Sequence, residues 1–252
     1  MNNKISILKI LPVKKDIEPQ SILNPVIPAH PFCLCICAPP KSGKTLLISN
    51  LLANENFYYC GNETDKDEPS YFNEIYYFSP TSRFDKTCKK ILGAMENVIQ
   101  IDDMDDLQNS AMYVEEIMKS QKEWNEQKEG RPRPKILLVF DDMVGILAQT
   151  KVDLLSTKYR HYGFSVIVNS QSYKKLPPVL RNCMSHFIWF NLMSEKEHVK
   201  LYEEHTQAIP EYWEYLKLLD KKYNFLYYNI DDQKVYHNFE RLLWSKNDYL
   251  TD

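Results

Sequence analysis

Short apolar runs alternate with amphipathic stretches along most of the chain. The apolar runs predict strands at 32–38, 73–80, 97–102, 135–142, 164–172 and 185–192. Apolar residues at helical spacing between them predict helices at 44–54, 85–95, 104–130, 152–163 and 194–206. Because strands that alternate with helices pair in parallel and carry the helices on their faces, the pattern predicts a three-layer α/β fold with a parallel sheet.

The two ends of the chain depart from this pattern. The first residues are rich in proline and predict an extended arm, 1–30, ahead of a core that spans 31–215. In the last segment, 216–252, two strand-like runs at 223–230 and 234–239 are joined by a short polar turn. This arrangement predicts a C-terminal β-hairpin.

Composition and charge narrow the class of protein. The chain has 252 residues, of which 44% are hydrophobic, enough to fill a sizeable core. Its formal net charge is −3, so any contact with nucleic acid must come from a local basic patch. An apolar run near the N-terminus is interrupted by Lys9, and no later run approaches a membrane-spanning length. We therefore expect neither export nor a membrane anchor.

Cysteine usage indicates a reducing compartment. Cys33, Cys35 and Cys37 alternate along one predicted strand, so their side chains share a face, which predicts buried thiols. A zinc site is the alternative, but the spacing lacks the separated pairs that such sites use, and the other three cysteines are scattered. Free buried thiols are typical of an intracellular protein.

The sequence APPKSGKT follows the first predicted strand and precedes the first predicted helix, where a phosphate-binding loop would stand. Backbone N–H groups at the start of the helix would surround the phosphates, assisted by the helix dipole. Gly43 permits the tight turn, Lys44 would reach the β- and γ-phosphates, and the Thr45 hydroxyl would bind Mg²⁺. The expected nucleotide-binding residues are Ala38, Lys41, Ser42, Gly43, Lys44, Thr45 and Leu46.

This loop departs from the usual glycine-rich form at Ala38, Pro39 and Pro40. The methyl group of Ala38 is the smallest possible addition. The two prolines lack N–H donors, but they lie upstream of the amides that matter most for phosphates, and they favour an extended exit from the strand. The alternative is a strand-to-helix turn that merely contains Gly-Lys-Thr.

The predicted strand at 135–142 ends in two carboxylates. A buried strand that delivers an acid beside the loop is the second nucleotide-binding motif, so Asp141 would orient Mg²⁺ and Asp142 would act as the base toward the attacking water. Helix capping by the two acids is the alternative. Asp142 also begins a D-x-x-G sequence, but the guanine-reading N-K-x-D motif of a GTPase does not follow.

Polar amides end the next strand. Asn169 and Gln171 would face the same crevice as the loop, because the carboxyl ends of parallel strands meet at one edge of a sheet. There an amide can sense the γ-phosphate or hold the water. The alternative is a turn in which the amide bonds the backbone.

Taken together, these motifs resemble those of the A32-like DNA-packaging ATPases of poxviruses, giant viruses and virophages, within the FtsK/HerA superfamily of P-loop motors. Four motifs in order, between about Cys33 and Leu192, carry the resemblance: APPKSGKT, ILLVFDD, YRHYGFSVIVNSQ and LPPVLRN. The resemblance implies a RecA-like ATPase of the ASCE type that forms a homo-oligomeric ring. It also implies ATP and Mg²⁺ as cofactors, with hydrolysis driving double-stranded DNA, bound without sequence specificity, into a preformed capsid.

The resemblance also implies roles for single residues. Lys44 and Thr45 match the phosphate and Mg²⁺ residues, and Asp141 matches the metal carboxylate. Asp142 matches the catalytic acid, which is more often glutamate in the superfamily, and Gln171 matches the sensor. Arg160 matches the arginine that ring motors insert into a neighbour's site, and Arg181 is a second candidate; a surface salt bridge is the alternative for both.

Partners and location follow from the same resemblance. Capsid or portal proteins would dock the ring, which would work in the host cytoplasm or a viral factory and could join the virion. The candidate DNA contacts, each also readable as solvated surface, are Lys151, Lys158, Lys174, Lys175 and the stretch 128–135. Two other functions stay open: a nucleotide-gated assembly protein with little turnover, and a P-loop kinase, for which the region after Gln171 offers few arginines.

Overall fold

A computed structural model describes residues 24–54, 57–58, 70–127, 133–143, 146–147, 152–192 and 194–249. Within these residues the chain forms one nine-stranded sheet in the order β3-β2-β4-β5-β1-β6-β7-β8-β9. The first six strands in this order are parallel, which confirms the predicted α/β class. The strands are β1 (Cys33–Cys37), β2 (Glu74–Phe78), β3 (Val98–Ile101), β4 (Ile136–Asp141), β5 (Phe164–Ser170), β6 (His186–Trp189), β7 (Leu226–Asn229), β8 (Lys234–His237) and β9 (Arg241–Ser245).

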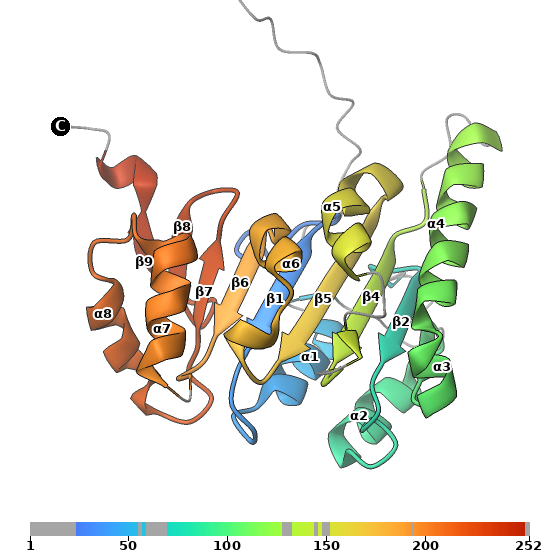
Figure 1. Cartoon of the computed structure of the whole chain (residues 1–252), viewed down its shortest axis with the longest axis horizontal. Coiled ribbons are helices and arrows are strands. Elements are labelled where there is room, and N and C mark those ends of the chain that lie inside the picture. Colours follow the sequence, from blue (N-terminus) through green and yellow to red (C-terminus); the bar gives the residue numbers. More distant parts are fainter. Residues whose placement is uncertain are drawn as a thin grey trace, which may run out of the picture.

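Helices cover both faces of the sheet (Figure 1). The helices are α1 (Lys44–Ala53), α2 (Lys86–Ile91), α3 (Met104–Gln108), α4 (Ser110–Gln127), α5 (Val152–Tyr162), α6 (Pro178–Cys183), α7 (Glu195–Leu201) and α8 (Tyr212–Tyr215). Shorter turns of tighter or wider helix occupy Leu92–Ala94, Tyr173–Lys175, Tyr202–Thr206, Leu216–Asp220 and Lys246–Tyr249. None of the described helices is long and apolar enough to cross a bilayer.

Two hydrophobic cores lie on opposite faces of the sheet, because alternate side chains of each strand point to opposite sides. Cys33, Cys35 and Cys37 belong to the core beneath α4 to α8, and Leu34 and Ile36 belong to the core beneath α1 and α2. All five side chains are fully buried. The expectation that the three thiols share a buried face is therefore confirmed.

The order of the central strands positions the site. β5 lies between β1 and β4, with Cys37 paired to Ser170 and Asp141 paired to Asn169. The ends of these three strands therefore lie side by side at one edge of the sheet. In Figure 1 the parallel strands point toward the lower edge, where the loop after β1 projects.

The predicted C-terminal hairpin is present as β7 and β8, which extend the sheet antiparallel to β6. β9 adds a further strand that the sequence pattern did not predict. The helix expected at 104–130 is two helices, α3 and α4, separated at Asn109. The side chain of Asn109 donates to the carbonyl of Asp105, so it closes the first helix locally, as asparagine commonly does at a helix end.

Candidate nucleotide-binding site

The loop between β1 and α1 is tied to the neighbouring strand where it begins. Ala38 is fully buried, and its backbone N–H donates to the carbonyl of Ser170 over 3.0 Å. Two residues farther along adopt positive φ, Lys41 at 63° and Gly43 at 104°. A glycine meets this requirement without strain, and it stands immediately before the first residue of α1.

The carbonyls of Ala38 and Pro39 accept hydrogen bonds within the loop. The ammonium of Lys44 donates to the carbonyls of Ala38 and Pro39, over 2.9 and 3.1 Å, and the hydroxyl of Ser42 donates to Pro39 over 2.7 Å. The loop is thus held in a closed curve by its own lysine. Burial lowers the pKa of Lys44, while the nearby carboxylates of Asp142 and Asp141 oppose that shift.

Asp141 is the last residue of β4 and only 3% exposed. The hydroxyl of Tyr77, from β2, donates to its Oδ2 over 2.6 Å, and the amide of Asn169, from β5, donates to its Oδ1. Burial raises the pKa of Asp141, and these two donors partly offset the rise because they stabilise the carboxylate. The carboxylate is therefore held in one orientation from both sides.

Asp142 follows directly and meets Gln171. Nε2 of Gln171 donates to Oδ1 of Asp142 over 2.7 Å, which joins the ends of β4 and β5. Asp142 has a φ of 56°, a left-handed conformation that non-glycine residues adopt rarely and at an energetic cost. This turn sends the Asp142 side chain toward Gln171 instead of onward along the strand. Val144 and Gly145, the rest of the D-x-x-G sequence, lie outside the described residues.

The oxygen atoms at this edge suit Mg²⁺, which prefers hard oxygen ligands and commonly combines one or two protein ligands with phosphate oxygens. Thr45 offers a hydroxyl in the first turn of α1, and Asp141 offers its carboxylate. Oδ1 of Asn169 is buried and has no hydrogen-bond partner among the described residues, so it can accept a hydrogen bond from an ordered water. The described residues contain no cluster of three His, Cys, Asp or Glu side chains that could hold a metal ion.

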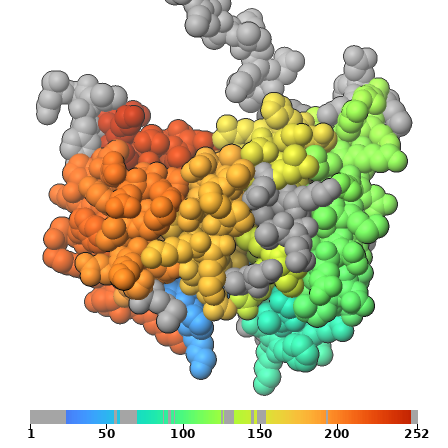
Figure 2. Space-filling model, in the orientation of Figure 1, coloured from blue at the N-terminus to red at the C-terminus, as the bar shows by residue number. Residues whose placement is uncertain are grey.

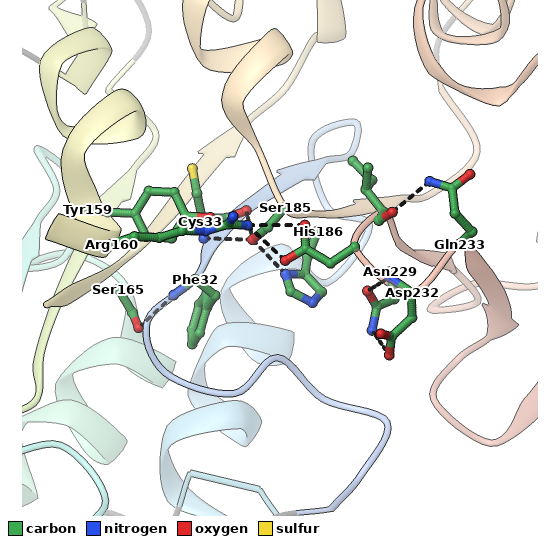
Figure 3. A network of polar contacts seen from close by, with 12 residues as sticks. Phe32, Cys33, Tyr159, Arg160, Ser165, Ser185, His186, Asn229, Asp232 and Gln233 are labelled. Atoms are coloured by element: carbon green, nitrogen blue, oxygen red, sulfur yellow. Dashed lines mark hydrogen bonds and ion pairs between the residues drawn. The ribbon is translucent and has the colours of Figure 1, made fainter. Parts of the chain in front are cut away.

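Arg160 lies near Cys33 and His186, the first residues of β1 and β6, and so away from the edge that holds the loop (Figure 3). It sits in the last turn of α5, which leads into the start of β5, so it lies at the opposite edge of the sheet from the loop. Its Nη2 atom bonds both carboxylate oxygens of Asp231, over 3.1 and 2.8 Å, and its Nε donates to the hydroxyl of Tyr159 over 2.9 Å. Within one chain Arg160 cannot serve the loop.

Arg181 is embedded in the fold. Its side chain is 11% exposed, lies 3.2 Å from a carboxylate oxygen of Glu204, and stacks with its guanidinium carbon 5.2 Å from the ring centre of Tyr173. The hydroxyl of Tyr173 donates to the same Glu204 oxygen over 2.5 Å. These contacts hold Arg181 against Glu204 and Tyr173 of its own chain, and its role as an arginine finger stays a prediction.

The residues expected to contact DNA differ in exposure, and some of them lie outside the described residues. Lys158, Lys174 and Lys175 are exposed. Arg133 donates to the carbonyl of His161 over 3.1 Å. Lys151 and residues 128–132 lie outside the described residues. The exposed lysines at 174 and 175 follow Gln171 closely, so this basic pair lies near the candidate catalytic edge.

Tyr77 is the site residue that the sequence reasoning missed. It occupies a strand that carries no nucleotide-binding motif, and its contact with Asp141 depends on β2 pairing with β4. A tyrosine between apolar positions of a predicted strand was the available signal, because a buried hydroxyl needs a partner.

Comparison with known proteins places these features in a family. The family described as "Poxvirus A32 protein" matches residues 24–207. No curated protein matches the sequence. Among solved structures, the genome packaging NTPase B204 of Sulfolobus turreted icosahedral virus 2, with ATP-gammaS, is similar with a TM-score of 0.51 and 16% identity, over 82% of this chain and 96% of that one.

Two further solved structures share the fold. ATPases 2 and 3 of EssC from Geobacillus thermodenitrificans match with a TM-score of 0.54 and 14% identity, over 84% of this chain and 39% of that one. The pCW3 conjugation coupling protein TcpA matches with a TM-score of 0.54 and 14% identity, over 87% and 62%. These likenesses confirm the P-loop ATPase fold. From the match over most of its length, the chain belongs to the poxvirus A32 protein family.

Proposed function

We propose that this chain is an ATP-driven motor that moves double-stranded viral DNA into a preformed capsid. One observation carries the proposal: Lys44, Asp141, Asp142 and Gln171 lie at the ends of three adjacent strands, β1, β4 and β5, in a chain of the A32 family. Two structural relatives, a genome packaging NTPase in complex with ATP-gammaS and a conjugation coupling protein, support ATP use and DNA handling.

The residues divide the chemistry between them. Lys44 would leave the carbonyls of Ala38 and Pro39 for the β- and γ-phosphates, and the N–H groups that begin α1 would hold the phosphate oxygens. Thr45 and Asp141 would hold Mg²⁺, which supplies charge neutralisation on the phosphates when bound. Asp142 would accept a proton from the attacking water, or orient it, while Gln171 positions Asp142 and senses the γ-phosphate.

A ring of subunits would supply the arginine that the nucleotide site of one chain does not receive from its own Arg160. Arg160 points away from its own loop and is 58% exposed, so a neighbouring subunit is the partner it could serve as an arginine finger. All six residues proposed for hydrolysis and metal binding lie within 31–215, which supports that range as the ATPase core: Thr45, Asp141, Asp142, Arg160, Gln171 and Arg181. Capsid or portal proteins would anchor the ring where viral genomes are packaged, in the host cytoplasm or a viral factory.

The test is ATP hydrolysis by the purified full chain, measured with and without duplex DNA and alongside its oligomer mass. A motor should hydrolyse ATP faster when DNA is added, and both Lys44→Ala and Asp142→Asn should abolish the activity. No hydrolysis under any condition would rule out the motor. Hydrolysis that survives both substitutions would place the chemistry elsewhere.

The second candidate is a nucleotide-gated assembly protein, in which bound ATP holds a ring on a capsid with little turnover. The hydrogen bonds within the loop support this second function. Lys44 must give up its hydrogen bonds to the carbonyls of Ala38 and Pro39 before it can bind phosphate, which would slow turnover. Tight ATP binding and ring formation without DNA-stimulated turnover would identify this function.

A further inference from the structure

A pocket of about 250 Å³ lies beside the phosphate-binding loop. One wall is the outer side of α1, with Leu46, Leu47 and Asn50. The facing wall comes from the C-terminal part of the chain, Tyr223, Phe225 and the turn 238–240 between β8 and β9. The hairpin region therefore closes a space that begins at the loop.

The pocket and the loop share Gly43. The ring of Tyr223 packs so closely that a Cβ atom built on Gly43 would lie 2.6 Å from its Cδ1. Glycine at this position thus serves two requirements, the positive φ of the loop and the approach of the Tyr223 ring. Leu46, the residue after Thr45 in α1, also lines the pocket, so the pocket begins beside the residues that would hold phosphates.

The lining suits a flat, uncharged ring system. Phe225 packs against Phe190 and Phe239, with ring centres 5.5 and 5.0 Å apart, so the floor of the pocket is aromatic. Asn238 and Glu240 add polar groups at the rim. None of the described lining residues is Lys or Arg, and the carboxylate of Glu240 would repel a phosphate.

The volume of the pocket also fits a nucleotide base. A cavity of about 150 Å³ accommodates one benzene ring in a well-studied engineered protein, so about 250 Å³ leaves room for a base of two fused rings.

Tyr223 is strained in this pocket. Its φ is 74°, which is rare for a bulky side chain and costs of order 1–3 kcal/mol, and the residue is 50% exposed although it is aromatic. The ammonium of Lys222 lies 4.7 Å from the ring centre. Tyr223 thus lies between the pocket and the phosphate-binding loop. It can contact a ligand that occupies the loop and the pocket together.

We propose that this pocket binds the base of the nucleotide whose phosphates lie in the loop, with Tyr223 packed against that base. The inference rests on the nucleotide binding proposed above. It assigns the C-terminal hairpin region a direct part in nucleotide recognition and predicts that a polyphosphate without a base uses only half of the site.

The test compares two probes, Mg²⁺–ATP and Mg²⁺–tripolyphosphate, by calorimetry on the full chain. Stacking of a base on an aromatic side chain contributes about 1–3 kcal/mol, so Tyr223→Ala should weaken ATP binding roughly 5- to 150-fold while tripolyphosphate binding stays unchanged. Tyr223→Phe should retain ATP affinity. The matched control is Trp213→Ala, another partly exposed aromatic residue, which lies on α8 and should leave both affinities unchanged.

A second measurement follows the base itself. The fluorescence of 2-aminopurine riboside triphosphate should be quenched on binding to the wild-type chain, and the quenching should be weaker with Tyr223→Ala. Equal loss of ATP and tripolyphosphate affinity in Tyr223→Ala would overturn the base pocket, because Tyr223 would then act through the loop. Equal affinity of the wild-type chain for both probes would also overturn it. Failure of the wild-type chain to bind either probe would instead remove the proposed function on which the pocket rests.

Discussion

Gln171 donates a hydrogen bond of 2.7 Å to the carboxylate of Asp142, and this contact links the ends of two neighbouring strands of the sheet. Because Asp142 adopts a positive φ, its side chain turns toward β5 and away from the continuation of β4. The contact makes Asp142 and Gln171 a unit, in which the amide fixes the direction of the carboxylate. Residues that act as a unit lose activity together when either is changed.

Substitution of this pair should therefore be non-additive. Asp142→Asn removes the base and should lower kcat by about 10²- to 10⁴-fold. The affinity for ATP should change little, because the proposed phosphate contacts come from Lys44 and the start of α1. Gln171→Ala should lower kcat as well, and the double variant should be no slower than Asp142→Asn alone. Steady-state hydrolysis and nucleotide affinity of the four proteins measure this. Losses that multiply in the double variant would show that the two side chains act independently.

Tyr77 should position Asp141. Tyr77→Phe deletes the hydroxyl that donates to Asp141 over 2.6 Å, and loss of an outer partner of a metal ligand commonly costs about 10- to 100-fold in metal affinity or activity. The expected result is a higher Mg²⁺ concentration for half-maximal hydrolysis, read from a Mg²⁺ titration. The control is Tyr76→Phe, since its hydroxyl bonds Glu74 on the other face of the strand. Equal effects of the two variants would mean that the strand, and not the Asp141 contact, is responsible.

Arg160 has a partner within its own chain, which supplies a control for the arginine-finger proposal. Arg160→Ala subunits mixed into wild-type protein should lower the specific activity more than dilution alone, because each would disable a neighbour's site. Asp231→Asn removes the carboxylate that Arg160 contacts in the same chain but keeps the arginine, so it should spare the activity. A strictly proportional loss in the mixtures, or equal damage from Asp231→Asn, would assign Arg160 to the ion pair.

The sequence predicted the strands that have a local pattern of their own. The strands carrying Ala38 and Asp141 at their ends are continuous apolar runs, and parallel pairing then places their carboxyl ends together whatever the strand order. Gln171 was predictable for the same reason. The strand order itself, with β5 between β1 and β4, brings Gln171 within hydrogen-bond distance of Asp142, and it depends on packing across the whole sheet.

The missed residues depend on such long-range packing. Tyr77 lies 64 residues before its partner Asp141, and Tyr223 meets Gly43 from the other end of the chain. Neither belongs to a short motif. The contact of Arg181 with Glu204 likewise exists only in the fold, because an arginine in a helix carries no local mark of burial. Its role in hydrolysis stays a prediction.

Two buried histidines should make the fold sensitive to acid. Burial lowers the pKa of His186 to about 3 and that of His30 to about 4, with the charges of Arg160, and of Lys135 and Arg133, acting in the same direction. Both are therefore neutral in the folded chain, while the unfolded chain takes up protons below about pH 6.5. The unfolded state then binds more protons, so the free energy of unfolding should fall as the pH decreases from about 6.5 toward 4.

The measurement is urea unfolding of the wild type and of His186→Gln between pH 4 and 7. Glutamine can still bond the neighbouring hydroxyl of Ser185, as His186 does over 2.8 Å, but it cannot gain a proton. The difference in unfolding free energy, wild type minus variant, should therefore decrease steadily below pH 6.5, because only the wild type has this proton to take up. Carboxylates titrate equally in both proteins and cancel in the difference. A difference that does not change with pH would show that His186 keeps its ordinary pKa in the fold.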